Sequence, residues 1–190
     1  HAKTQQICVV CPCYHEEQGI QAFYDDLKQV LTDQCPTIGH RIVFVDDGSR
    51  DATLQRLKEI EARDESVLVY SLARNQGHQI ALSAGLEIAS GDAVIVMDSD
   101  LQHPPTLIPE LIEQWNQGHD VVLAVRQQTE GASLFKRLTS DGFYWVFNFL
   151  SDVKLTPGAA DFCLLSHRAH QALCEMPERR RFLRGMVAWM

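Results

Sequence analysis

The stretch that most constrains the fold is residues 93–105, AVIVMDSDLQHPP. Its apolar run, residues 94–97, is rich in Val and Ile and is typical of a strand buried on both faces. The run leads directly into Asp98, Ser99 and Asp100, and Gln102 follows. Burying two carboxylates without a partner is costly, and oxygen ligands of this kind suit Mg²⁺ or Mn²⁺. The stretch predicts a metal that holds a phosphate-bearing substrate. The alternative is an acidic turn that caps the next helix.

The rest of the chain alternates strand and helix patterns around this segment. Helices are predicted over residues 17–33, over a segment that begins after an N-cap at Ser49 or Asp51, over residues 80–88 and over residues 107–115. The small residues of the 80–88 helix predict that it packs close to the sheet. Apolar runs predict the remaining strands at residues 7–12, 41–45, 67–72, 121–125 and 160–165. This order indicates an α/β fold, a Rossmann-like, doubly wound, mostly parallel sheet flanked by helices. At 190 residues, the chain is expected to be a single domain.

Composition excludes some classes of function. The net charge of −8 argues against bulk nucleic-acid binding, which needs a basic surface. No run approaches the roughly 18 apolar residues of a membrane span. Cys8 and Cys11 form a C-x-x-C on a predicted strand, where residues three apart face opposite ways, so we expect core packing in a reducing compartment. No nearby ligand completes a zinc set with His167 and His170, which we expect at the surface.

Polar groups follow three of the predicted strands. They are residues 12–16, the pair Asp46 and Asp47, and residues 98–100. Adjacent parallel strands bring such ends to one edge of the sheet, where open α/β folds bind ligands. Carboxylates there can accept from a nucleobase and a ribose, and Tyr14 can stack on the base. A G-x-G-x-x-G is absent after the first strand, which favours a metal as the phosphate binder.

Five segments together resemble a known family: PCYHEE, FVDDGSRDAT, RNQGHQIALSAGL, MDSDLQHPP and RFLRG. They are similar to the family 2 glycosyltransferases with the GT-A fold, and within these to the polyprenyl-phosphate glycosyltransferases that resemble dolichol-phosphate mannosyltransferase. The resemblance covers nearly the whole chain. It implies inverting transfer of a hexose from a UDP- or GDP-sugar to a polyprenyl phosphate. It also implies a single GT-A catalytic domain over residues 1–190 at the cytoplasmic face of a membrane, with membrane-associated segments after Met190; a homo-oligomer is compatible with it.

The strand ends and the resemblance together define the expected site. The nucleotide-sugar set is Pro12, Tyr14, Glu16, Asp46, Asp47, Asp98, Ser99 and Asp100. The implied metal ligands are Asp98, Asp100 and Gln102. The implied contacts to the acceptor phosphate are Arg126, Lys136, Arg137 and Ser140. The expected catalytic residues are Asp100, Arg126 and Asp161.

The acceptor chemistry follows from ionisation. A phosphate monoester, with a second pKa of about 6, is already an anion near pH 7 and needs cations rather than a general base. Arg126 and Lys136 supply such cations, and on a helix Lys136 and Ser140 share one face. The aromatic run at residues 143–149 is compatible with contact to lipid or to a partner subunit, and the arginines of residues 179–184 with an interfacial segment. The alternative is a core helix followed by a solvated run of charges. A hydroxyl acceptor would instead need a base, for which Asp161 is the candidate.

Two departures from the family pattern and three rival functions remain. The family more often has Asn where this chain has His15, and Arg where it has Cys163. A soluble glycosyltransferase acting on a sugar hydroxyl is one alternative. A phospho-acceptor receiver domain is another, but here the fifth strand ends in Arg126 rather than a lysine. A nucleotidyltransferase would have a glycine-rich, lysine-bearing first turn, which residues 12–16 are not.

Overall fold

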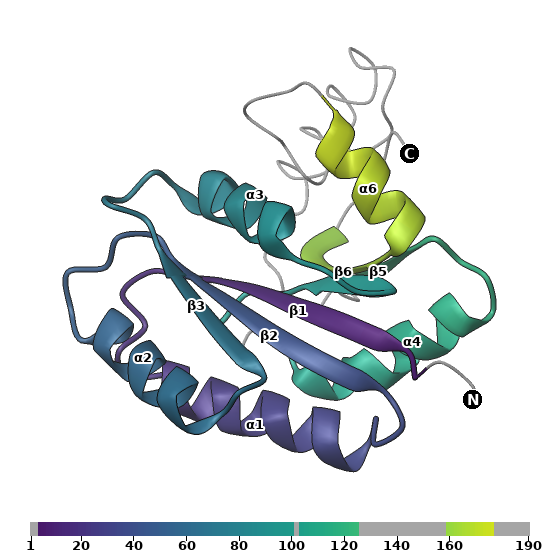
Figure 1. The fold of residues 1–190 in the computed structure, drawn as a ribbon, viewed down its shortest axis with the longest axis horizontal. Coiled ribbons are helices and arrows are strands. Elements are labelled where there is room, and N and C mark those ends of the chain that lie inside the picture. Colours follow the sequence, from purple (N-terminus) through teal and green to yellow (C-terminus); the bar gives the residue numbers. More distant parts are fainter. Residues whose placement is uncertain (1–3, 101–102, 126–158, 177–190) are drawn as a thin grey trace, which may run out of the picture.

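The computed structural model describes residues 4–100, 103–125 and 159–176. These residues form a six-stranded sheet with the order β3-β2-β1-β4-β6-β5 (Figure 1). The strands are β1 (Gln6–Cys13), β2 (Gly39–Asp46), β3 (Val67–Ser71), β4 (Ala93–Val96), β5 (Val121–Val125) and β6 (Ala159–Ser166). Strands β3, β2, β1 and β4 pair in parallel, whereas β6 pairs antiparallel with both β4 and β5. The predicted mostly parallel sheet is confirmed.

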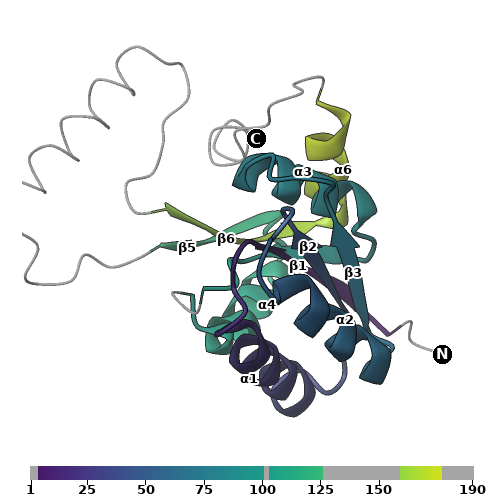
Figure 2. The same ribbon diagram turned by 90° about the vertical axis from the view of Figure 1, so that its left-hand side faces the viewer.

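Helices cover both faces of this sheet. They are α1 (Ile20–Asp33), α2 (Thr53–Arg63), α3 (His78–Ile88), the 3₁₀ helix η1 (Pro105–Leu107), α4 (Ile108–Asn116) and α6 (His167–Glu175). Figures 1 and 2 show α1, α2 and α4 on one face and α3 and α6 on the other. Helix α1 begins later than predicted because residues 16–19 form a turn, in which Gly19 and Ile20 donate their backbone N–H groups to the Glu16 carbonyl.

Strand β1 divides the core into two clusters. Val9 and Cys11 pack with the α1 and α4 side, and Cys8 and Val10 pack with the α3 and α6 side. The prediction that Cys8 and Cys11 face opposite ways is therefore confirmed. All six cysteines are among the described residues, and each is a free thiol. Burial raises the pKa of Cys8 to about 11, so this thiol stays neutral.

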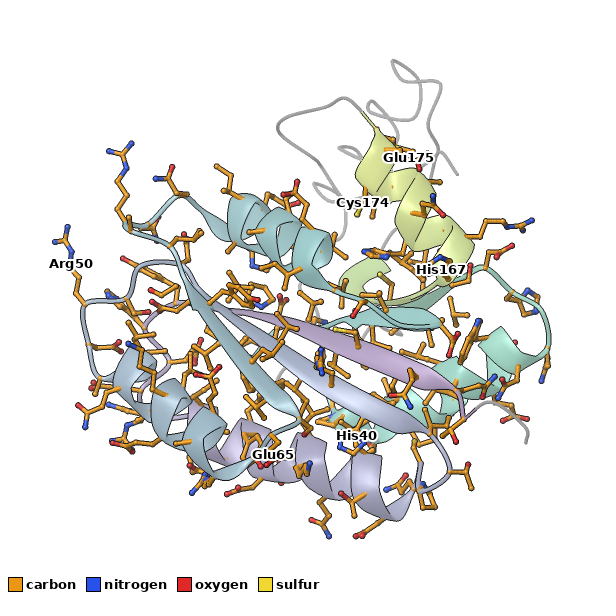
Figure 3. The ribbon with its side chains drawn as sticks, in the orientation of Figure 1. His40, Arg50, Glu65, His167, Cys174 and Glu175 are labelled. Carbon is orange, nitrogen blue, oxygen red and sulfur yellow. The ribbon has the colours of Figure 1, made fainter. Side chains whose placement is uncertain are left out.

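Helix α3 lies close against the sheet, as its small residues predict. A Cβ atom added at Gly85 would lie 2.4 Å from Val10 Cγ1 and 3.0 Å from Val45 Cγ2. On the same face, α6 packs beside α3, and Figure 3 shows His167 and Cys174 on α6. The surface prediction was wrong for His170, which is buried and donates Nε2–H to the Leu86 carbonyl at 2.7 Å.

The start of α2 also differs from the prediction. Its N-cap is Ala52, without a side-chain cap, so the expected cap at Ser49 or Asp51 was wrong. Asp51 Oδ1 instead accepts from the backbone N–H and the hydroxyl of Thr53, two residues further on. Within residues 4–100, 103–125 and 159–176, no helix is long and apolar enough to cross a bilayer.

Candidate active site

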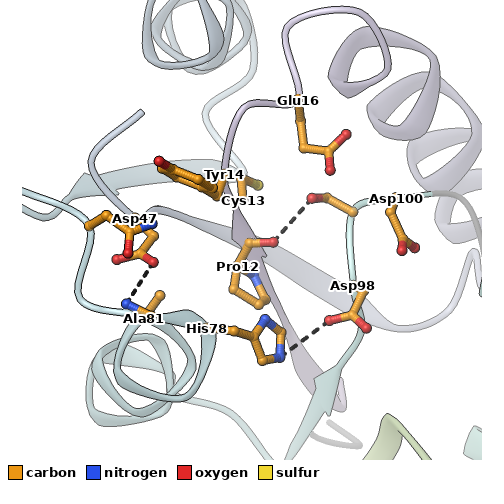
Figure 4. A pocket seen from close by; sticks show the side chains of 12 residues that line it. Pro12, Cys13, Tyr14, Glu16, Asp47, His78, Ala81, Asp98 and Asp100 are labelled. Carbon is orange, nitrogen blue, oxygen red and sulfur yellow. Dashed lines mark hydrogen bonds and ion pairs between the residues drawn. The ribbon is translucent and has the colours of Figure 1, made fainter. Parts of the chain in front are cut away.

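The carboxyl ends of β2, β1 and β4 meet at one edge of the sheet, as the sequence predicts. A pocket of about 340 Å³ opens there (Figure 4). It is lined by Pro12, Cys13, Tyr14, Glu16, Asp47, Asn75, Gly77, His78, Ala81, Asp98, Ser99 and Asp100. Seven of the eight residues expected to contact a nucleotide sugar are in that set; the exception is Asp46. The parallel order β2-β1-β4 therefore assembles one site from segments far apart in the chain.

The acidic segment that follows β4, residues 98–100, is held against the end of β1 by Ser99. Ser99 is buried, and its hydroxyl donates to the Pro12 carbonyl at 3.0 Å. Asp98 and Asp100 flank Ser99 and line the pocket on either side of it. Because the serine is fixed inward, the two carboxylates keep a defined spacing at the pocket wall.

The donor set fits a hard divalent cation that also binds a substrate. Mg²⁺ is commonly held by one or two carboxylates together with substrate phosphates rather than by an all-protein cage. Asp98 and Asp100 supply such carboxylates, while Gln102, the third expected ligand, lies outside the described residues. Within the described part of the chain, no three His, Cys, Asp or Glu side chains form a metal-holding group. A divalent cation held by these two carboxylates would therefore take further ligands from the phosphate oxygens of a substrate.

Two histidines face Asp98. His78 Nε2 lies 3.5 Å from Asp98 Oδ1, and His103 Nδ1 lies 3.8 Å from Asp98 Oδ2. His103 is buried, and its ring lies 5.6 Å from that of Phe162 on β6. Across the pocket, burial raises the pKa of Glu16, and the negative charges of Asp100 and Asp51 add to this effect. Negative charge accumulates at this edge of the sheet, which favours a cation.

Asp47 attaches a distant loop to the pocket. Its buried carboxylate accepts from the backbone N–H of Gln76 at 2.7 Å and of Gly77 at 2.9 Å. The loop before α3 passes so close that a Cβ at Gly48 would lie 2.4 Å from the carbonyl carbon of Arg74, and the φ of Gly48 is +68°. Asp47 thus shapes the pocket wall as well as lining it.

Asp46 is the one residue of the expected nucleotide-binding set that does not line the pocket. It is fully buried. Its carboxylate accepts from the backbone N–H of Ser49 at 3.1 Å and from the hydroxyl of Ser71 at 2.8 Å. The physical reason is the period of two along a strand, because successive side chains point to opposite sides. Asp46 therefore joins the ends of β2 and β3.

Several residues that line the pocket were not predicted from the sequence. Asn75, Gly77, His78 and Ala81 line the pocket from the loop before α3 and from its first turn. They lie within the segment RNQGHQIALSAGL, but they follow no acidic strand end, so no role was assigned to them. Two features could have indicated these residues: the segment itself, and the need of the Asp47 carboxylate for hydrogen-bond donors, which Gln76 and Gly77 supply.

The remaining predicted residues fall in two groups. Arg126, Lys136, Arg137 and Ser140, the expected acceptor contacts, lie outside the described residues. The loop at residues 127–133 and the aromatic run at 143–149 lie outside them as well. Asp161 belongs to β6, which pairs antiparallel with β4 so that Cys163 lies opposite Val96. Two residues further along this register, the backbone of Asp161 lies beyond the end of β4, at the level of Asp98.

Known proteins resemble this chain over most of its length. Residues 8–170 match the family described as Glycosyl transferase family 2. An uncharacterized glycosyltransferase from Synechocystis sp. is 38% identical over 187 residues, 98% of this chain and 58% of the relative. A bactoprenol glucosyl transferase of Shigella phage SfV is 38% identical over 185 residues, 97% of this chain and 60% of the relative. The chain thus spans about three fifths of the length of these curated relatives.

Two solved structures share the fold. Glucosyl-3-phosphoglycerate synthase from Mycobacterium tuberculosis, solved with Mn²⁺, UDP-glucose and phosphoglyceric acid, has a TM-score of 0.67 at 22% identity and covers 97% of this chain and 64% of its own. A mannosyltransferase from Pyrobaculum calidifontis, solved with GDP-Man and Mn²⁺, has a TM-score of 0.64 at 16% identity and covers 93% and 48%. At these identities the likeness concerns the fold.

Proposed function

This chain belongs to glycosyl transferase family 2 and has the GT-A fold. From that premise we propose that it moves a hexose from a nucleotide-diphosphate sugar to a polyprenyl phosphate, with inversion and with a divalent metal. The observation that carries the proposal is the pocket where Asp98, Asp100 and Glu16 gather at the edge of three parallel strands. The names of the relatives, bactoprenol glucosyl transferases at 37–38% identity, support the lipid acceptor.

The donor half of the site is proposed from the described residues. Tyr14 and Asp47 bind the nucleoside, and Asp98 and Asp100 hold the Mg²⁺ or Mn²⁺ together with the diphosphate. Complexes of GT-A neighbours with UDP-glucose or GDP-Man and Mn²⁺ support this arrangement. A bound divalent ion supplies stabilisation of the negative charge that builds on the diphosphate leaving group. Ser99 contributes by fixing the positions of the two carboxylates.

The transfer is proposed as one displacement. A phosphate oxygen of the acceptor attacks the anomeric carbon, and the bond from that carbon to the diphosphate oxygen breaks with its electron pair. Attack opposite the leaving group inverts the anomeric centre. The attacking phosphate is already ionised near pH 7, since its second pKa is about 6. Arg126, Lys136, Arg137 and Ser140 are proposed to hold it, and Asp100 and Arg126 to act nearest the reacting atoms.

The setting of the protein is proposed as well. Residues 1–190 act as a single catalytic domain at the cytoplasmic face of a membrane, where the polyprenyl phosphate lies, with membrane-associated segments in the longer protein. The names of the bactoprenol glucosyl transferase relatives support a membrane-borne acceptor, and the chain spans about three fifths of their length. A homo-oligomer is compatible with it, and nucleic acid is not a partner.

A competition between acceptors tests the proposal. A short soluble prenyl phosphate and its matching prenol are assayed with UDP-glucose and with GDP-mannose in the presence of Mn²⁺. We expect transfer to the phosphate alone, and loss of transfer in Arg126→Ala but not in Arg56→Ala, an exposed arginine on α2. Equal transfer to the prenol, or dependence on Asp161 without dependence on Arg126, would replace the proposal with a hydroxyl-acceptor glycosyltransferase.

A further inference from the structure

The first turn after β1 contains an unusual backbone conformation. His15 has φ = +55° and is the only non-glycine residue with a positive φ in the described part of the chain. Left-handed backbone is uncommon for residues with a Cβ, although Asn, Asp and His adopt it more often than others. Such conformations persist where the surroundings hold them, and they cluster at functional sites. Contacts with the loop before α2 and with Tyr14 hold His15 in this conformation.

Both ends of His15 are bound to the loop that precedes α2. Its backbone N–H donates to Ser49 Oγ at 3.0 Å, and its ring Nε2 accepts from the backbone N–H of Arg50 at 3.2 Å. Because the Arg50 N–H can only donate, Nε2 is the acceptor in this contact, which places the ring hydrogen on Nδ1. The next residue continues the attachment, since Glu16 N–H donates to Thr53 Oγ1 at 2.8 Å.

The ring held in this way lies against Tyr14. The two ring centroids are 4.0 Å apart and the planes differ by 17°, which is a stacked arrangement. Tyr14 lines the pocket and is 42% exposed, whereas His15 is exposed and does not line the pocket. One face of the Tyr14 ring is thus supported by His15, and Tyr14 remains accessible to a ligand in the pocket.

We propose that His15 is a positioning residue that holds the Tyr14 ring as a flat support for the nucleobase of the donor. This inference rests on the proposed function, because it needs a nucleotide in the pocket. A freely rotating tyrosine would have to be ordered when the base binds, which reduces affinity. The stacked imidazole, itself fixed by Ser49 and Arg50, orders the ring beforehand. His15 therefore acts on donor affinity and not on the transfer step.

The chain offers a substitution that separates backbone from ring. Asn also adopts positive φ readily, so His15→Asn retains the turn and removes the ring, and with it both the stacking on Tyr14 and the acceptor for the Arg50 N–H. Isothermal titration with UDP or GDP and Mn²⁺ should show a Kd raised roughly 3- to 10-fold, the range expected for loss of one aromatic pair. The KM for the nucleotide sugar should rise by the same factor, with kcat unchanged.

Three controls make the result specific. His119→Asn, an exposed histidine between α4 and β5, should leave nucleotide affinity unchanged. Pyrophosphate with Mn²⁺, which lacks a base, should bind His15→Asn and wild type equally. In a Tyr14→Ala background, His15→Asn should alter the Kd for UDP or GDP by less than about 2-fold, because a residue that acts through Tyr14 has no further effect without it.

The outcomes distinguish this inference from the function on which it rests. If wild type binds nucleotide but His15→Asn binds it equally well, the role of His15 is wrong and the proposed function stands. The same holds if pyrophosphate affinity falls equally, or if the effect persists in the Tyr14→Ala background. If wild type binds neither UDP nor GDP with Mn²⁺, both the proposed function and the role of His15 are wrong.

Discussion

Acidic side chains have different surroundings at the two ends of the parallel strands. At the amino edge, before β2 and β3, Asp64 is paired with a cation, since Lys28 Nζ lies 2.8 Å from Asp64 Oδ2. At the carboxyl edge, Glu16, Asp98 and Asp100 gather around one pocket. Figure 3 shows His40 and Glu65 at the first edge and Arg50 on the loop at the other. Acidic side chains are thus matched by a cation at the amino edge, whereas at the carboxyl edge they gather around the pocket.

The contrast is visible in the ionisation of the acids. Burial disfavours the charged form of Asp64, but hydrogen bonds from Lys28 and Ser66 outweigh it and hold the pKa of Asp64 well below its usual range. Burial and the charges of Asp100 and Asp51 raise the pKa of Glu16. A carboxylate that improves folding is stabilised as an anion by its neighbours. The Glu16 carboxylate at the pocket is instead destabilised as an anion by its neighbours, which is typical of functional sites.

The largest expected effect is at the carboxyl edge. Asp98→Ala or Asp100→Ala should reduce turnover on the order of 10³-fold or more, because metal stabilisation of a leaving group is worth several kcal/mol. Thermal unfolding should show an intact fold, and Asp26→Ala, an exposed aspartate on α1, serves as the matched control. Full activity in the Asp98→Ala/Asp100→Ala double variant, or in excess chelator, would contradict the proposed role of a metal in the transfer.

The matching change at the amino edge should act on stability alone. Lys28→Ala leaves the Asp64 carboxylate without its cation, and these side chains are 31% and 13% exposed. A cost of roughly 1–3 kcal/mol is expected, between the values for surface and buried pairs. Urea unfolding measures it, with Lys58→Ala on the exposed side of α2 as the control. An equal loss of stability in both variants, or a raised KM in Lys28→Ala, contradicts the proposed division of roles.

Asp47 both holds the loop before α3 and lines the pocket, so its substitution tests the two roles together. Both of its oxygens accept from backbone N–H groups, of Gln76 and Gly77, whereas an amide has one acceptor oxygen. Asp47→Asn should therefore loosen the loop and raise the KM for the nucleotide sugar roughly tenfold, with a smaller change in kcat. Asp33→Asn, at the exposed end of α1, is the control for steady-state kinetics. An unchanged KM with a collapsed kcat would place Asp47 in the chemistry.

The smallest effect is a pH dependence at the amino edge. Burial and the charge of Lys28 lower the pKa of His40, so the folded protein favours the neutral ring. The unfolded chain then binds more protons than the folded chain as pH falls below about 6.5, and stability decreases there. Urea unfolding at pH 7.5 and 5.5 should show this loss in wild type and a smaller one in His40→Gln. An equal loss in both would assign the pH dependence to other groups.

The positions of the strand ends were predictable because they depend on local patterns. Parallel strands and a period of two place residues 12–16, Asp47 and Asp98 at one edge without knowledge of any long-range contact. The small residues of α3 likewise predicted its close approach to the sheet, which the geometry at Gly85 confirms. Local periodicity therefore accounts for the fold class and for most of the pocket.

The residues whose surroundings were not predicted are those placed by contacts between distant segments of the chain. His78 enters the pocket because Asp47 binds the loop before α3, about 30 residues away in the chain. His170 is buried because α6 packs on α3, and a helical pattern of nine residues does not reveal its partner. Asp46 shares its residue type with Asp47, so composition could not separate the residue that joins the strands from the one that lines the pocket.

The most direct test of the central claim, that the carboxyl edge binds a metal together with a nucleotide, is electron paramagnetic resonance of Mn²⁺. The signal of free Mn²⁺ is recorded while UDP or GDP is added, with and without the protein. In wild type the signal should fall further than with nucleotide alone, and in the Asp98→Ala/Asp100→Ala double variant this additional loss should be absent. The same additional loss in the double variant would contradict the assignment of the site to these two carboxylates.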